Sequence, residues 1–524
     1  MYKTVDLFSG AGGLSFGFEE TDEFMIVAAA ESDADARRTY IENHKKNGLI
    51  KMIEDVRKYN FRELTREFDG IDIVIGGPPC QGFSNANRQK NHAISMNNSL
   101  IKEFFRAVRE MEPRAFVMEN VDSLSSKTHK FYDSYNDSEE INEMGITKKE
   151  EKFVLSEKGY PEIDLLNVLL NGREEYYSVS SILFRLLNVL YKNREKKEGL
   201  KRYIEKNRKV IITQIDNYFS SERFEHDLLT EIKESLKSEE SVIDFEGLGD
   251  FLKLQKAFLL KREFDENEII YRIEECEEEK IIARVHTYSV IDYVRAMLND
   301  LYKKTECILN SLDFGVPQER RRFFLIGIRE GYTELDSKRF AKNMKKGTSV
   351  ADAIFDIKDC IVYDEVSRDQ GVPYAENDKI SSFAKKMRLE SNKLYNHIVP
   401  KTGEEALKRF AELKEGENFH NLSEDMKKTY ANPGRTQNSI YLRLDSSKPS
   451  GTVVNVRKSM WIHPKLNRAI SVREAARLQS FPDRFRFFGS KDSQYQQVGN
   501  AVPPLMAQGI AMVISNKLAE GMSD

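Results

Sequence analysis

The most informative stretch of the sequence is residues 71–84, IDIVIGGPPCQGFS. Its first five residues are mainly apolar and β-branched, which predicts a short buried strand. The two glycines free the backbone, and the two prolines then fix φ and end the strand. Cys80 follows at the carboxyl end of that strand, where open α/β sheets place their ligands. A rigid loop that presents one thiol indicates a nucleophile, and the alternative is a strand-ending turn with an incidental cysteine.

Composition limits the classes of protein that the chain can belong to. Its 524 residues suffice for two or three domains, and 40% hydrophobic with 32% charged residues is typical of a globular protein. No apolar run is long enough to cross a bilayer, and the N-terminus lacks a signal-peptide core, so we expect a cytoplasmic protein without a membrane partner. The four cysteines lie far apart, which indicates neither a disulfide framework nor a zinc site. With a net charge of -4, any nucleic-acid partner must meet a local basic face.

The N-terminal segment resembles a nucleotide-binding opening. Residues 3–8 predict a strand, followed by the glycine-rich turn SGAGGL at residues 9–14 and a helix. Glycines let a ligand approach the backbone, and the helix N-terminus offers free N–H groups. The spacing is not the dinucleotide pattern Gly-x-Gly-x-x-Gly, so an ordinary βα turn is an equal alternative.

Acidic residues follow the next two expected strands. Residues 24–30 predict a strand that leads to Glu31, the position where such folds bind ribose hydroxyls. Asp33 instead predicts a helix N-cap, and the two roles are compatible. Asp55 follows another expected strand and could either bind an adenine amine or be a solvated loop residue.

A helix and a further strand follow the cysteine loop. Apolar residues at helical spacing predict an amphipathic helix over residues 100–111, which Pro113 ends. Residues 115–118 predict a strand that leads to Glu119. A glutamate there is a candidate acid, because the other strand ends carry a thiol and a glycine loop. The alternative is a solvated cap.

Six motifs of the sequence occur in a fixed order. They are DLFSGAGG (6–13), GPPCQGFS (77–84), ENV (119–121), FGVPQERRR (314–322), REAARLQSFP (473–482) and QVGNAVPP (497–504). Together they resemble the first, fourth, sixth, eighth, ninth and tenth motifs of the cytosine-C5 DNA methyltransferases, over roughly residues 1–125 and 286–520. The resemblance implies an α/β fold: a Rossmann-like S-adenosylmethionine-dependent methyltransferase domain, a smaller target-recognition domain and a mostly helical insertion.

The resemblance also implies the chemistry. The Cys80 thiolate would add to C6 of cytosine, so that C5 can attack a methyl group. Glu119 would meet N3 of the base, which requires a raised pKa. Arg322 would contact O2, with Arg320 near the nucleophile, although some of the three arginines at 320–322 could bind phosphate instead. Because the target base lies inside a duplex, the enzyme must flip it out.

S-adenosyl-L-methionine is the methyl donor that the resemblance implies. Phe8 would pack on the adenine, Glu31 would hold the ribose, and Gly10 would line the methionine end. The expected cofactor residues are Phe8, Ser9, Gly10, Gly12, Gly13, Leu14, Glu31, Ser32, Asp55, Val56, Pro78, Leu100, Asn500 and Ala501. The expected DNA contacts are Gln81, Ser84 and Gln318, and no metal is expected. Either residues 81–84 or the recognition region would fill the gap that the flipped base leaves.

The motifs also predict the domain organisation. The expected segments are a catalytic domain in three parts (1–125, 286–330 and 461–524), an insertion (126–285) and a target-recognition region (331–460). An apolar helix expected over residues 505–518 should pack beside the N-terminal strand, so that both chain ends build the cofactor pocket. The recognition region holds basic runs, from which phosphate contacts are expected.

The expected insertion is rich in charge and nearly free of proline. Residues 126–285 hold 27 basic and 35 acidic residues, with apolar residues at helical spacing. Acidic surface repels phosphate, so most of the insertion should face away from DNA, and the basic stretch at residues 196–209 is the possible exception.

These patterns predict a DNA (cytosine-5-)-methyltransferase. We expect a monomeric bacterial enzyme that is cytoplasmic, nucleoid-associated and bound to double-stranded DNA. It would be the partner of a separate restriction endonuclease or a solitary relative. A tRNA cytosine methyltransferase is a rival, but that branch carries a Cys-Phe-Thr tripeptide, which is absent here. A catalytically inactive DNA-binding paralogue is a second rival, yet Cys80, Glu119 and Arg322 are all present.

Overall fold

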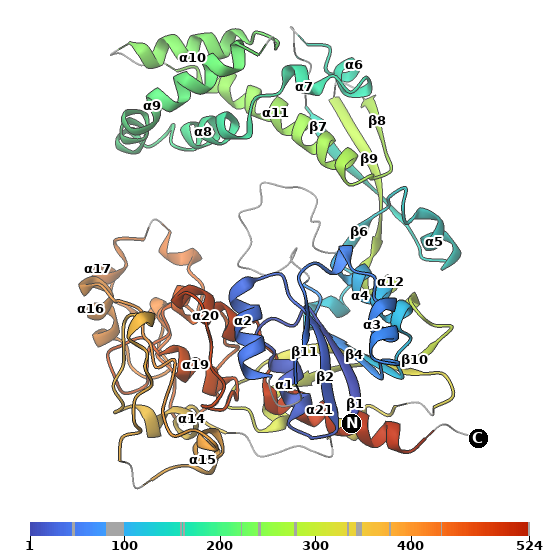
Figure 1. The fold of residues 1–524 in the computed structure, drawn as a ribbon. Coiled ribbons are helices and arrows are strands. Elements are labelled where there is room, and N and C mark those ends of the chain that lie inside the picture. The colour runs from blue at the N-terminus through green and yellow to red at the C-terminus, as the bar shows by residue number, and fades with distance from the viewer. Residues whose placement is uncertain are drawn as a thin grey trace. The chain divides into compact units, whose positions relative to one another are not determined.

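The structure, a computed structural model, divides into two compact units (Figure 1). It describes residues 1–44, 48–79, 99–157, 160, 163–221, 223–238, 243–276, 280–332, 335–341, 348–376, 379–430 and 432–521. Within these ranges the first unit comprises residues 1–79, 99–125 and 297–521, and the second comprises residues 126–296.

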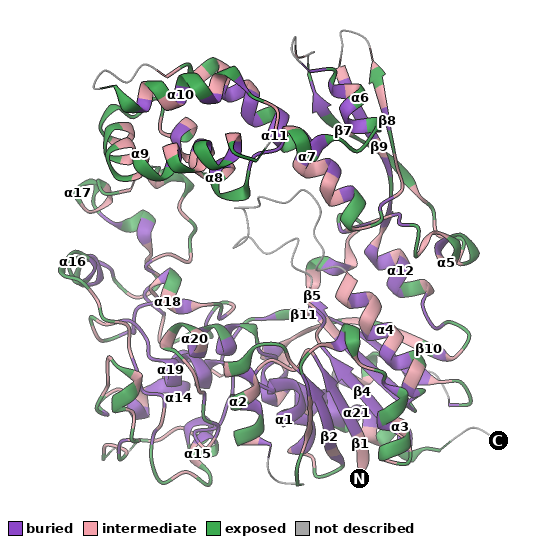
Figure 2. Cartoon of the chain, turned by 45° about the horizontal axis from the view of Figure 1, so that its top comes forward, coloured by how far each residue is buried: buried purple, intermediate pink, exposed green. Residues whose placement is uncertain are grey.

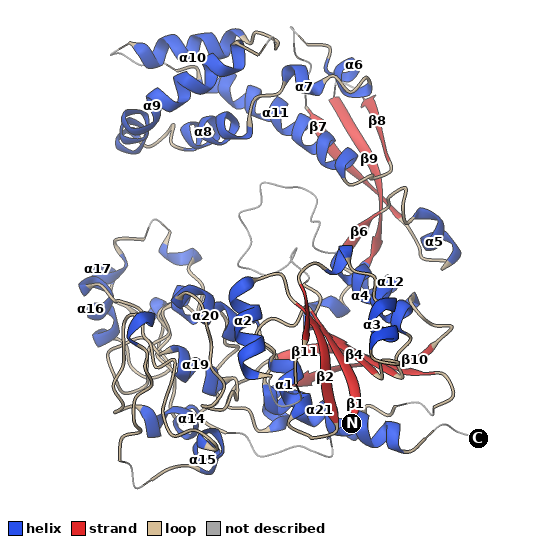
Figure 3. Cartoon of the chain, viewed as in Figure 1, coloured by secondary structure: helices blue, strands red, loops and turns tan. Residues whose placement is uncertain are grey.

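The first unit is built on a seven-stranded sheet with the strand order β10-β11-β5-β4-β1-β2-β3 (Figure 3). The strands are β1 (Tyr2–Leu7), β2 (Phe24–Ala30), β3 (Lys51–Ile53), β4 (Ile73–Gly76), β5 (Ala115–Val121), β10 (Tyr302–Asn310) and β11 (Arg321–Arg329). The first five are parallel, and β11 is antiparallel to both of its neighbours. Their mostly apolar residues are buried in a sheet that helices cover, as parallel sheets require (Figure 2). The predicted strands at the N-terminus, before the cysteine loop and before Glu119 are confirmed.

Both ends of the chain share one core in the first unit. The helices next to the sheet are α1 (Gly13–Glu19), α2 (Ala34–Asn43), α3 (Arg62–Glu67), α4 (Ser99–Met111) and α21 (Pro504–Ala519). A Cβ on Gly17 would lie 2.4 Å from the Ala507 Cβ, so α1 and α21 are in close contact. The predicted C-terminal helix is therefore present, and it packs on α1 in the core that also holds Ile75 of β4. The segment Lys491–Ala519 is long and apolar enough to cross a membrane. However, 67% of the most apolar part of this segment is buried inside the protein, which is typical of a core helix.

The predicted recognition region shares a core with the ninth and tenth motifs. Its helices are α13 (Lys338–Ala341), α14 (Val350–Ile354), α15 (Ser382–Arg388), α16 (Glu404–Glu412), α17 (Glu424–Lys427) and α18 (Val456–Ser459). They precede α19 (Val472–Leu478) and α20 (Lys491–Asn500). Residues of α14, α15, α19 and α20 belong to one buried cluster. The predicted limits of the region at residues 331 and 460 therefore lie within one compact unit.

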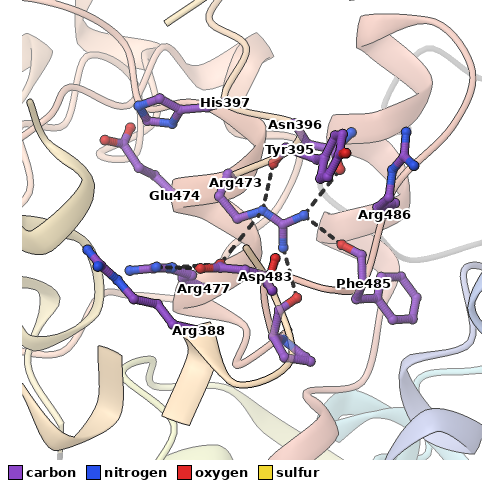
Figure 4. Close-up of polar contacts among 12 residues, drawn as sticks. Arg388, Tyr395, Asn396, His397, Arg473, Glu474, Arg477, Asp483, Phe485 and Arg486 are labelled. Atoms are coloured by element: carbon purple, nitrogen blue, oxygen red, sulfur yellow. Dashed lines mark hydrogen bonds and ion pairs between the residues drawn. The ribbon is translucent and has the colours of Figure 1, made fainter. Parts of the chain in front are cut away.

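Two buried arginines of the ninth motif hold this unit together (Figure 4). Arg477 donates to Asp483, with 2.6 Å between Nη2 and Oδ2, and to Asp356, with 2.5 Å between Nη1 and Oδ1. Arg473 donates to the main-chain oxygens of Tyr395 and Phe485 at 2.8 and 2.6 Å. A buried guanidinium is stable only when such partners replace its water shell. The ninth motif is thus a scaffold that joins residues 356–395 to residues 483–485 within the first unit.

The second unit combines helices with a small antiparallel sheet. The helices are α5 (Ser138–Glu143), α6 (Leu165–Leu170), α7 (Glu174–Tyr177), α8 (Ser181–Lys192), α9 (Lys197–Phe219), α10 (Asp227–Lys237), α11 (Phe245–Glu266) and α12 (Val290–Ala296). The strands are β6 (Lys130–Tyr132), β7 (Lys149–Ser156), β8 (Tyr271–Cys276) and β9 (Lys280–Ser289), and β9 pairs with the other three. The helices were expected and the sheet was not. The predicted insertion boundary at Val285 falls inside β9.

Candidate active site

The site residues gather at the carboxyl ends of neighbouring parallel strands. Strand β1 leads into the glycine loop, β2 leads to Glu31, β4 leads to Gly77, and Glu119 lies near the end of β5. Because parallel strands end at the same edge of a sheet, these four positions share one side of the first unit. The predicted nucleophile Cys80 and the predicted DNA contacts Gln81 and Ser84 lie outside the described residues.

Glu119 and Arg322 form a half-buried ion pair at this edge. Strand β11 pairs Arg322 with Val121 of β5, which lies two residues beyond Glu119. The side chains of Arg322 and Glu119 therefore project from adjacent strands. Arg322 Nε lies 2.9 Å from Glu119 Oε1. Burial raises the pKa of Glu119, and the positive charges of Arg322 and Arg320 oppose that rise. The raised pKa expected from the sequence is therefore present, with burial as its main cause.

The start of the cysteine loop lies against the Glu119 carboxyl. A Cβ on Gly77 would approach Glu119 Oε2 to 2.9 Å, so only glycine leaves the carboxyl its full space. Asn120 Nδ2 also donates to the Pro78 oxygen at 2.9 Å. Glu119 and Asn120 of β5 therefore contact the first residues of the loop after it leaves β4. Sequence reasoning gave Asn120 no role, although its place within the ENV motif was a usable signal.

Gln318 and Arg320 are scaffold residues in this structure. Gln318 is fully buried; its Oε1 accepts from Val453 N at 2.6 Å, and its Nε2 donates to Gln479 at 2.7 Å. The predicted DNA contact of Gln318 is therefore corrected, because both ends of its amide are used inside the protein. Arg320 is buried and donates to the main-chain oxygens of Val453 and Gly499 at 3.0 and 3.1 Å. It ties the segment after the recognition region to the tenth motif, behind the Glu119 pair.

Glu31 fixes the glycine loop that follows β1. Its two carboxylate oxygens accept from Gly10 N and Asp33 N, each at 2.8 Å. Asp33 in turn caps α2 by accepting from Ala36 N, so its predicted N-cap role is confirmed. Phe8 adopts a φ of 58°, a strained value for a residue with a side chain. Strain of this kind is typical of ligand-binding loops.

A buried polar cluster behind the loop was missed by sequence reasoning. The rings of Tyr40 and His44 stack 4.0 Å apart, and the Tyr40 hydroxyl donates to Asp6 Oδ2 at 3.2 Å. A Cβ on Gly12 would lie 2.2 Å from His44 Cε1, so the loop rests directly on this stack. Burial raises the pKa of Asp6 to about 7 and lowers the pKa of His44 to about 4. The only sequence signal was the placement of Tyr40 and His44 one helical turn apart.

The two chain ends meet at the start of α1. A Cβ on Gly13 would lie 2.3 Å from the Val502 oxygen and 3.2 Å from the Ala501 Cβ. The tenth motif therefore borders the glycine loop, as the resemblance to the methyltransferase motifs implied. Asn500 is exposed and accepts a hydrogen bond from Gln496 at 2.7 Å.

The other expected cofactor residues differ in their surroundings. Leu14 is part of the hydrophobic core beneath the loop. Arg57 already binds both Asp55 carboxylate oxygens, at 2.9 and 3.0 Å, and lowers the Asp55 pKa. Val56 and Pro78 are buried, Leu100 is half-buried at the start of α4, and Ser32 is exposed.

The glycine loop fits a ligand with a polar end. A Cβ on Gly10 would meet no atom within 4 Å, so space remains beside the backbone at this point. The Ser9 hydroxyl is buried and has no hydrogen-bond partner among the residues that the structure describes. Open space and an unsatisfied hydroxyl at the carboxyl end of β1 match the requirements of S-adenosylmethionine, whose amino-acid end is polar.

The strand order and the glycine loop at the carboxyl end of β1 define a Rossmann-like fold. The family model of the C-5 cytosine-specific DNA methylases matches residues 2–147 and 281–516. The chain belongs to this family. It is a DNA (cytosine-5-)-methyltransferase that takes the methyl group from S-adenosylmethionine and acts on DNA.

Similar proteins agree over almost the whole chain. The type II methyltransferase M.DdeI of Desulfomicrobium norvegicum is 26% identical, over 98% of this chain and 88% of its own length. The DNA (cytosine-5-)-methyltransferase M.ApeKI of Aeropyrum pernix is also 26% identical, over 99% of both chains. A solved E. coli prophage protein, described as a DNA modification methyltransferase, has a similar fold, with a TM-score of 0.56 and 20% identity over 99% of this chain and 100% of its own.

Proposed function

We propose that the enzyme methylates a flipped-out cytosine through a covalent bond between Cys80 and C6 of the base. The observation that carries the proposal is the Glu119–Arg322 pair, which lies against the first residues of the cysteine loop. Cys80 is only three residues beyond Gly77, so its thiol and the Glu119 carboxyl can reach the same base.

Each group has a distinct part in the proposed reaction. The Cys80 thiolate forms a bond to C6, and the electron pair displaced from the C5–C6 double bond moves toward N3 and O2. Glu119, whose pKa burial raises, would in its protonated form donate a hydrogen bond to N3, and Arg322 would stabilise the charge at O2. Bound S-adenosylmethionine would supply an electrophilic methyl group: as C5 bonds to the methyl carbon, the carbon–sulfur bond would break and its electron pair would leave with S-adenosylhomocysteine. A base then removes the C5 proton, the C5–C6 double bond forms again, and the thiolate leaves.

The cofactor would be held at the carboxyl ends of β1 and β2. Phe8, Ser9, Gly10 and Glu31 border the open space beside the loop. Residues 500 and 501 close the same site from the other end of the chain, because Gly13 lies against the tenth motif. Asp55 would need to share its carboxylate between Arg57 and the adenine amine.

The biological setting that we propose is a bacterial restriction-modification system. M.DdeI is named a type II methyltransferase, and it aligns with 98% of this chain. By this likeness the enzyme would protect duplex DNA from a separate cognate endonuclease. It would act as a monomer in the cytoplasm, associated with the nucleoid, and would read its target with residues 331–460.

Covalent trapping tests the proposal. In duplex DNA with 5-fluorocytosine at the target, C5 carries a fluorine, which cannot leave as the proton does. The wild-type enzyme should therefore remain covalently bound to the base through Cys80. Cys80→Ala should abolish both trapping and methyl transfer, whereas the control Cys307→Ala should retain both. Peptide mapping locates the labelled cysteine. A label on Cys276, Cys307 or Cys360 would refute the assignment.

The target sequence requires a separate measurement. Bisulfite sequencing of DNA from an expressing host should reveal one short sequence with methylated cytosine. A parallel assay with tRNA should give no transfer, and methylation of tRNA alone would reject DNA as the substrate.

A further inference from the structure

We propose that the N-terminal half of α9, in the second unit, is a docking surface for the phosphate backbone of duplex DNA. This inference adds a non-catalytic contact to the established activity. Three observations carry it: the separation of charge within the unit, the exposure of α9, and the absence of ion pairs on its basic face.

Charge is strongly segregated within the second unit. Residues 192–209 hold nine basic and three acidic residues, a net charge of +6. The other residues between 126 and 285 hold 18 basic and 32 acidic residues, a net charge of -14. A polyanion is therefore repelled by most of this unit and attracted to the segment that runs from the end of α8 into α9, where residues 197–209 alone hold six basic and two acidic residues.

The basic face of α9 is open to solvent. Figure 2 shows much of this helix in green, and none of its residues before Ile211 is buried. Leu200, Tyr203 and Ile204 pack on the helical core, so they turn the opposite side of the helix outward. The outward cations are Lys197, Lys201, Arg202, Lys206, Arg208 and Lys209, all exposed.

These cations are not held by ion pairs with described residues, although Arg202 Nε donates to the main-chain oxygen of Glu198 at 3.2 Å. None of the six forms an ion pair with a carboxylate in the described part of the chain, whereas Lys237 and Lys253 of the same unit pair with Glu234 and Asp250. Glu198 and Glu205 lie one turn from several of these cations, yet six cations against two carboxylates leave a net charge of +4 on residues 197–209. This excess positive charge favours an external anionic partner.

Duplex DNA matches this face in length and charge. From Lys197 to Lys209 the helix is about 18 Å long, at 1.5 Å per residue. The same length of duplex carries about ten phosphate charges. The chain already binds duplex DNA as its substrate, and a tether converts a second contact with the same molecule into an intramolecular event. DNA outside the target sequence is thus the partner that α9 fits best.

The test is the salt dependence of DNA binding by the full chain. One variant carries Lys201→Gln, Lys206→Gln, Arg208→Gln and Lys209→Gln. The matched control removes the same charges from ion-paired positions of the same unit, with Lys237→Gln, Lys253→Gln, Lys280→Gln and Arg272→Gln. The probe is a mixed-sequence duplex of about 40 base pairs, long enough to extend beyond a target site, titrated between about 50 and 200 mM salt.

The α9 variant should bind about tenfold more weakly at the lowest salt. Its slope of log affinity against log salt should be smaller by up to about 3–4, at about 0.9 per lost phosphate contact. The control should match wild type, and both variants should keep the wild-type melting temperature and methylate the same sequence. A slope and affinity equal to those of the control in the folded α9 variant would overturn the proposal.

Discussion

The arginines of the ninth motif and the cations of α9 differ in burial and in partners. In the first unit, Arg477 is fully buried, and its guanidinium binds Asp483 and Asp356. In the second unit, the cations of α9 are exposed and unpaired with any described carboxylate. Both regions place basic residues at helical spacing, two in REAAR (473–477) and five in KRYIEKNRK (201–209).

The difference teaches that basic residues in a DNA-binding enzyme cannot be assigned to DNA by their charge. Burial without a partner costs several kcal/mol, so a buried arginine must be satisfied within the protein. An exposed arginine or lysine pays no such cost and remains available to phosphate. Arg320 is buried like Arg477 but only partly satisfied: its two Nη atoms donate to main-chain oxygens, whereas its Nε has no hydrogen-bond partner among the described residues.

The largest effect is expected at the buried arginine. Arg477→Met should lower the free energy of unfolding by about 3–5 kcal/mol, because Asp483 and Asp356 lose a buried partner. The control Arg368→Met removes an exposed pair with Asp364 and should cost about 0–1 kcal/mol. Urea unfolding measures both. Equal values for the two variants would erase the distinction between buried and exposed arginines.

A smaller effect on the free energy of unfolding is expected from ionisation of Asp6, the buried acid behind the glycine loop. The Asp6 pKa is raised to about 7, so the folded protein keeps this proton at pH values where the unfolded chain releases it. The stability that the proton provides is complete below pH 4 and is lost as the pH rises through about 7. Relative to Asp6→Asn, wild type should lose about 1–3 kcal/mol between pH 5 and 8. Unfolding midpoints at several pH values provide the comparison, and parallel curves would mean that Asp6 ionises normally.

No change in target is expected from removal of the second unit. A short Gly/Ser linker in place of residues 126–296 should leave the methylated sequence unaltered, because we assign base reading to residues 331–460 in the other unit. Circular dichroism first establishes that the variant is folded, and bisulfite mapping then identifies its target. Methylation of a different sequence would place base reading in the second unit, and the role of α9 would extend beyond phosphate contact.

Local pattern made much of the first unit predictable. The strands that end near Phe8, Glu31, Gly77 and Glu119 were all expected, because short apolar runs bounded by glycine, proline or acid are strong signals. The cap at Asp33 was likewise local. The small sheet of the second unit was missed, since charged residues interrupt the apolar alternation of β7 and β8.

What the sequence by itself determined is the order of strands, turns and reactive residue types, because these depend on neighbours in the chain. Only the tertiary structure decided which polar residues became scaffold: Gln318 and Arg320 belong to a motif of this family, yet both bind main-chain groups of residues 453–499. Tyr40 and His44 lie beneath Gly12 for the same reason. Desolvation depends on what packs around a side chain, and the partners of Gln318 and Arg320 lie 133 to 179 residues away, a distance that no local pattern records.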